Sequence, residues 1–106
     1  MTKAEKIQKI QEILEIKNPK ENLYADLLKT MGDLKNNYGD YMITEPIDCD
    51  EELERIPKAD YELCTALLTM LLREDHFSNG SFERRFAEGQ VIPVLVRMKD
   101  VLKNET

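Results

Sequence analysis

The chain has 106 residues with 15 basic and 21 acidic side chains, which give a formal net charge of −6 and a pI near 4.8. At 42% apolar and 34% charged residues, it is too apolar for a disordered protein and too charged for a membrane protein. The length predicts a single domain, residues 1–106, and the acidity argues against nucleic acid as a partner, because such binding depends on Lys and Arg.

The first part of the chain predicts two amphipathic helices. Thr2 and Glu5 have the spacing of a capping box, so the first helix is expected to begin at Thr2 and to carry an isoleucine stripe. Residues 18–21 predict the start of the second helix, with Asn18 as its cap. A run of leucines follows, and the second helix is expected to end at residues 36–39.

Residues 39–58 predict an irregular connection, because Pro46 and Pro57 each disfavour helical geometry at the residue before them. Between these prolines Asp50 is expected to cap a short helical turn. Ile43 and Ile47 are among the apolar residues expected to pack the connection against the helices.

The connection also holds most of the net charge, because residues 41–60 contain two basic and seven acidic side chains. One interpretation of this segment is a solvated surface, and the other is a contact face for a basic partner. The residues of the candidate acidic contact face are Asp48, Asp50, Glu51, Glu52 and Glu54.

Three helices are expected in the second half, at about residues 59–75, 81–88 and 90–103. The first of them is apolar on nearly all sides, which is typical of a central, buried helix. Gly89 is expected to end the second helix in a left-handed conformation. Because no segment predicts a strand, the fold class is an all-α, compact bundle of four or five helices with one irregular acidic connection.

A polar turn joins the first two of these helices and contains the chain's only histidine. The residues of interest are Arg73, Asp75, His76, Phe77 and Gly80. One interpretation makes His76 a general base or metal ligand beside Asp75, and the other makes the segment a structural turn. In the structural interpretation, Phe77 anchors the turn in the core and Gly80 adopts a positive φ.

The rest of the sequence gives little support for metal binding, phosphate binding or catalysis. One histidine supplies too few ligands for a metal site, and no phosphate-binding glycine motif or nucleophile motif is present. Cys49 and Cys64 form no short motif and are interpreted as structural thiols. We therefore expect no metal, no cofactor and no enzymatic activity.

The segment LLTMLLREDHFSNGSFERRFAEGQVIPVLVRMKDVL resembles a family of small all-helical bacterial and phage-borne proteins of unknown function, over residues 61–102. In that family a leucine-rich helix leads to a turn that Arg73, Asp75, Phe77 and Gly80 match, and a final apolar helix follows. His76 replaces a more frequent arginine and Asn79 a more frequent aspartate. The resemblance implies an all-α fold and no catalytic residues.

The functional expectation is a non-enzymatic protein-protein interaction module in the cytoplasm, since no secretion signal or membrane-spanning run is visible. A protein partner is expected, with a homodimer as one form, but neither nucleic acid nor a membrane. The alternative is a phage or mobile-element inhibitor or immunity-type protein that presents residues 45–54 to a basic partner. The third is an enzyme centred on Asp75 and His76.

Overall fold

The structure, a computed structural model, describes residues 1–17 and 19–104. Within these residues it contains six α-helices, two short 3₁₀ turns and no strand. The helices are α1 (Lys3–Leu14), α2 (Glu21–Met31), α3 (Cys49–Leu53), α4 (Tyr61–Phe77), α5 (Ser81–Ala87) and α6 (Ile92–Asn104), and the 3₁₀ turns are η1 (Tyr38–Tyr41) and η2 (Ile56–Lys58). The all-α prediction is confirmed, but the expected number of helices is too low, because α3 forms inside the connection.

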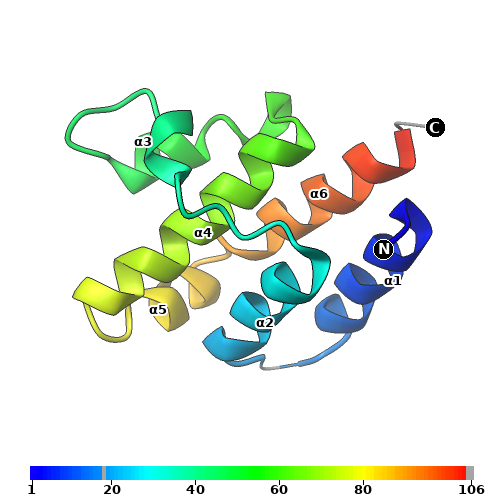
Figure 1. Cartoon of the computed structure of the whole chain (residues 1–106). Helices are drawn as coiled ribbons and strands as arrows, with labels where there is room; N and C mark the ends of the chain where they lie inside the picture. Colours follow the sequence, from blue (N-terminus) through cyan, green and yellow to red (C-terminus); the bar gives the residue numbers. More distant parts are fainter. Residues whose placement is uncertain (18, 105–106) are drawn as a thin grey trace.

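Helix α4 is the central element, and α2, α3, α5, α6 and η1 all pack against it, while α1 packs on α6 and α2 (Figure 1). Asp60 caps its N-terminus by accepting a hydrogen bond of 2.8 Å from the amide of Leu63. Nearly every side chain from Tyr61 to Leu72 is buried. The prediction of a central, buried helix is therefore confirmed for this part of α4.

The helix boundaries in the first part of the chain are partly as predicted. The capping box is present, because the Thr2 hydroxyl and the Glu5 carboxylate each accept a hydrogen bond of 3.1 Å from the other residue's amide. Helix α2 begins at Glu21 with Lys20 before it, and the expected cap, Asn18, lies outside the described residues. Gly32, with a φ of +74°, ends α2 earlier than predicted because a left-handed residue stops a helix.

One cluster of buried side chains draws on all six of these described helices. The radius of gyration is 12.8 Å, close to the roughly 13 Å expected for a folded domain of about 100 residues. Phe82 of α5 packs against Tyr24 of α2, with ring centroids 4.9 Å apart. Among the described residues, no helix combines the length and the apolar character needed to cross a bilayer.

Phe77 does not anchor the turn in the core, which corrects the prediction, because 84% of its surface is exposed. Helix α4 continues through Phe77 and carries this side chain beyond the part of the helix that its neighbours cover. The buried aromatic residue next to the turn is Phe82, which is 1% exposed. The turn is thus anchored by the aromatic residue that follows it.

The connection between η1 and α3 lies at the end of the molecule opposite the start of α1 and the end of α6 (Figure 1). Tyr38 and Met42 pack partly against the core, as expected, and Cys49 does so too. Ile43 and Ile47, however, are 73% and 40% exposed. The connection is therefore attached to the helices at its two ends and exposes apolar side chains between them.

Candidate functional site

The predicted turn between α4 and α5 is held by Asp75. Its carboxylate accepts hydrogen bonds from the amides of Gly80 and Phe82, at 3.1 and 3.0 Å. Gly80 has a φ of +87°, so the prediction of a positive φ is confirmed. His76 is exposed, and its ring lies edge-on to Phe77 with centroids 5.3 Å apart. Asp75 and His76 thus make separate contacts, the first with amides of the turn and the second with Phe77.

Glu21, at the start of α2, contacts this turn and was not predicted as part of any site. A hydrogen bond with Asp75, together with partial burial, raises the pKa of Glu21 to about 7. The same hydrogen bond and the amides of the turn lower the pKa of Asp75. The two carboxyl groups can therefore share one proton, which helps to join α2 to the turn at acidic pH.

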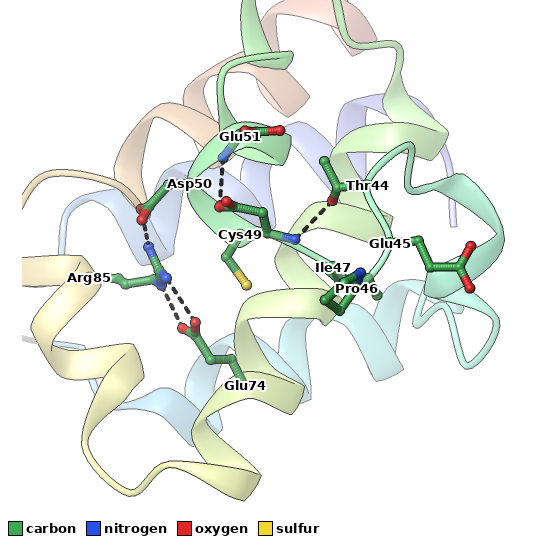
Figure 2. A pocket seen from close by; sticks show the side chains of 10 residues that line it. Thr44, Glu45, Pro46, Ile47, Cys49, Asp50, Glu51, Glu74 and Arg85 are labelled. Carbon is green, nitrogen blue, oxygen red and sulfur yellow. Dashed lines mark hydrogen bonds and ion pairs between the residues drawn. The ribbon is translucent and has the colours of Figure 1, made fainter.

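Arg85 of α5 connects the predicted acidic face to Glu74, which lies next to the predicted turn residues. Its Nη2 and Nε atoms donate to both oxygens of Glu74, at 2.8 and 2.5 Å, and its Nη1 atom donates to Asp50 at 2.9 Å (Figure 2). A second bond from Nη1 reaches Gln90, also at 2.9 Å. Arg85 therefore links α3 to the end of α4, and it lowers the pKa values of Glu74 and Asp50.

Glu52 does not belong to the acidic contact face, which corrects the prediction, because its side chain is completely buried. Its carboxylate accepts hydrogen bonds from the amides of Ile43 and Thr44, at 3.0 and 2.8 Å, from the Thr44 hydroxyl, and from Arg55 at 2.7 Å. A buried carboxylate needs such donors because burial without them is costly. Glu52 therefore holds the connection in place from inside.

The other predicted acidic residues are exposed. Asp48 caps α3 by accepting a bond of 3.2 Å from the amide of Glu51, a position that the sequence analysis had given to Asp50. Asp50 contacts Arg85, while Glu51 and Glu54 are exposed on α3 and at its end. The structure thus keeps four of the five predicted residues at the surface.

Two hollows lie along this surface. The larger is open, about 570 Å³ in volume, and is bordered by residues 44–51 together with Glu74 and Arg85 (Figure 2). The smaller, of about 280 Å³, is lined largely by apolar side chains, including those of Tyr38, Met70 and Phe77. The hollows share a border formed by Ile47, Cys49 and Glu74.

We call the surface around these hollows the connection face. It consists of the exposed residues Ile43, Glu45, Ile47, Asp48, Asp50, Glu51 and Phe77. Ile43 belongs to it because Ile43 and Ile47 together line a further hollow beside the first two. These seven residues are apolar or acidic, and one exposed basic residue, Arg73, also lines the smaller hollow.

The cysteines have the environment of structural thiols. Burial and the neighbouring Glu74 carboxylate raise the pKa of Cys49 to about 12, and burial raises the pKa of Cys64 to a similar value. A thiol in this state is protonated near neutral pH and is a poor nucleophile. In the part of the chain that the structure describes, no three Asp, Glu, His or Cys side chains are grouped as metal ligands would be.

Several members of the site could not be predicted from the sequence, for physical reasons. Arg85 contacts residues 11 and 35 positions away, so no local spacing could have indicated its role. Ile43, Ile47 and Phe77 were assigned to the core because large apolar residues are usually buried. Their exposure became visible only once the path of the chain around α4 was known.

Comparison with known proteins identifies one family. A family model described as "Family of unknown function (DUF6508)" matches residues 34–104, which contain the whole connection face. The comparisons with curated proteins and with solved structures gave no match. The predicted resemblance to a family of unknown function is confirmed, and the match extends further toward the N-terminus than residues 61–102.

Proposed function

We propose that this chain, which belongs to the family of unknown function matched over residues 34–104, acts by binding another protein through its connection face. The observation that supports the proposal is the grouping of exposed apolar side chains. Among the described residues six large apolar side chains are exposed, and three of them, Ile43, Ile47 and Phe77, lie on the connection face. Contiguous exposed apolar surface with a polar border is typical of protein-binding sites.

The exposure of Phe77 is the strongest single element of this argument. A phenyl ring that is 84% exposed gains almost nothing from folding, and the adjacent core already accommodates Phe82. A ring in this position becomes stabilising only when another surface covers it. Burial by a partner is therefore the function that this geometry favours.

We also propose that the binding is not accompanied by catalysis, in a reducing cytoplasm where both thiols stay reduced. The carboxylate of Asp75 is engaged by the turn, and His76 contacts Phe77. Cys49 is protonated and lies against a carboxylate. Asp75 and Cys49 are thus engaged in contacts within the fold, and among the described residues His76 has no acidic partner beside it.

The inhibitor or immunity-type function is a second candidate, favoured by the acidic border of the larger hollow. Glu45, Asp48, Asp50 and Glu51 all line this hollow and are exposed. A surface of this kind attracts a basic partner during diffusional encounter, and the association should weaken as salt concentration rises. The homodimer stays a prediction.

The experiment that tests the proposed function is affinity capture from the source cell with three forms of the chain. The wild type is compared with an Ile47→Ser/Phe77→Ser double variant and with Val96→Ser, which replaces an exposed apolar residue of α6 outside the face. A partner that binds the wild type and Val96→Ser, but not the double variant, supports the proposal. Identical sets of captured proteins for all three forms would refute it.

A further inference from the structure

The apolar hollow on the connection face has the size of an anchor site for one side chain. Its volume of about 280 Å³ lies just below the range of roughly 300–1,000 Å³ that is typical of small-molecule sites. Tyr38, Ile47, Met70 and the exposed ring of Phe77 supply most of its apolar lining, while Arg73, Glu74 and Ser78 supply the polar part. Protein interfaces place large apolar side chains in pockets of this kind.

The larger hollow beside it is electrostatically negative. Arg85 is already engaged by Glu74 and Asp50, so its positive charge is balanced within the molecule. Glu45, Asp48 and Glu51 are exposed on the same hollow, and none of them forms an ion pair with another described residue. A ligand that fills this hollow must therefore supply positive charge.

The two hollows form one continuous surface because Ile47, Cys49 and Glu74 border both of them. We infer that the partner of the connection face is a basic amphipathic helix, with a large apolar side chain that enters the smaller hollow and Lys or Arg side chains that contact the carboxylates of the larger one. A helix suits this arrangement because residues three or four positions apart lie on the same side of it. The inference rests on the proposed function and specifies the chemistry of the partner.

The negative charge of the connection face argues against three other binding partners: a nucleic acid, an anionic membrane and a second copy of the chain. Phosphate groups of a nucleic acid or an anionic membrane would lie against the carboxylates of Glu45, Asp48 and Glu51 and be repelled. A second copy of the chain, docked face to face, would bring the same carboxylates together. A basic helix is the occupant that satisfies both the apolar and the acidic part of the surface.

The test uses a labelled synthetic peptide of about 18 residues, which is long enough to form a helix. Its Leu residues recur about once per helical turn, and so do its Lys residues. Two control peptides replace every Lys by Glu or every Leu by Ser. We expect saturable binding of the first peptide in fluorescence anisotropy, and affinities at least about tenfold lower for both controls. Equal binding of the Leu→Ser peptide would overturn the inference, because charge alone would then account for it.

Variants of the protein locate the binding. Phe77→Ser is expected to lower the affinity for the Leu/Lys peptide at least about tenfold. Glu45→Gln/Glu51→Gln should lower it less, but should make the affinity less sensitive to salt between about 0.05 and about 0.5 M. Glu12→Gln removes an exposed charge on α1 and should leave the affinity unchanged. Equal affinities for all forms would overturn the inference.

The remaining outcomes separate the inference from the proposed function. If affinity capture finds a partner that depends on Phe77 but no basic peptide binds, the proposed function stands and the inference fails. If vesicles with anionic lipid or a single-stranded RNA bind the face more tightly than the Leu/Lys peptide, the inference fails as well. If capture finds no partner that depends on the face, the proposed function itself fails.

Discussion

The region around α4 and the connection face are stabilised in opposite ways. Around α4 the side chains from Tyr61 to Leu72 are almost all buried, and apolar burial holds the helices together. On the connection, polar anchors do this: Glu52 fixes the loop from inside, and Arg85 joins α3 to α4. We therefore expect substitutions on the connection face to change stability less than substitutions of the side chains buried around α4.

Two phenylalanines, five positions apart, show the same contrast within one residue type. Phe82 is 1% exposed and contacts Tyr24, whereas Phe77 is 84% exposed. Substitutions of Phe82 and Phe77 should therefore give the largest and the smallest losses in the free energy of unfolding. Substitutions of the residues that hold the turn and the connection should give intermediate losses.

The largest effect is expected for Phe82→Ala. Truncation of a buried aromatic side chain leaves a cavity and typically lowers the free energy of unfolding by about 3–5 kcal/mol. Urea denaturation monitored by circular dichroism measures it, with Phe77→Ala as the matched control. A loss for Phe82→Ala no larger than that for the control would contradict the assignment of these residues to core and surface.

A smaller loss, of about 1.5–3 kcal/mol, is expected for Glu52→Gln, because hydrogen bonds to a buried charged group are removed or weakened. Hydrogen exchange should show faster exchange at the amides of Ile43 and Thr44, which donate to this carboxylate. The exchange rates of the α4 amides should change only as far as the global free energy of unfolding changes. Unchanged exchange at both connection amides would show that Glu52 does not hold the loop.

Glu52 should also make the stability of the folded chain depend on pH, and the direction of this dependence follows from its pKa. Burial raises the pKa of Glu52, but the hydrogen bonds from Thr44, Arg55 and the amides outweigh burial, so its pKa lies below the usual 4.5. The folded state therefore binds fewer protons, and the stabilisation is present above about pH 4.5 and lost as pH falls through the lower pKa of the folded state. The stability difference between wild type and Glu52→Gln should narrow over this range in acid.

Gly80→Val is expected to cost about 1–2 kcal/mol, because an L residue is strained at a φ of +87°. No atom would lie within 4 Å of the added Cβ, so the cost comes from the backbone and not from a clash. The control is Glu83→Ala, an exposed position of the same helix. Equal denaturation midpoints for the two variants would remove the argument that the turn requires glycine.

The smallest effect on stability is expected for Phe77→Ser, within about 0.5 kcal/mol of the wild type, because surface substitutions rarely exceed this value. Binding through the connection face should nevertheless be lost. Unchanged stability together with lost binding would distinguish the connection face most clearly from the buried region around α4. A large loss of stability would instead indicate that Phe77 contributes to the folded chain by itself.

Most of the fold could be predicted from the sequence because its signals are local. The capping box of Thr2 and Glu5, the continuous apolar run of α4 and the left-handed Gly80 and Gly89 each act within a few residues. Helix α2 ends at Gly32 and not at residues 36–39, because one left-handed glycine is enough to stop a helix. Local patterns thus give the elements well and their ends less well.

The candidate site could be predicted only in part, because its contacts join residues that are distant in the chain. The acidic segment and the turn were both identified, but the bonds that link Asp50 to Glu74 run through Arg85, which no sequence pattern marks. The general rule that charged residues are exposed and large apolar residues are buried also fails here for residues of both kinds. A charged residue, Glu52, is buried, and an aromatic residue, Phe77, is exposed.

The positions of the two cysteines give the molecule a natural pair of chemical reporters. Cys49 lies half-buried on the border of both hollows, whereas Cys64 is completely buried in α4. A thiol reagent should therefore reach Cys49 through local opening and Cys64 only when the chain unfolds. The modification rate of the first would follow occupancy of the connection face, and that of the second would follow global stability, in the unaltered protein and in a single reaction.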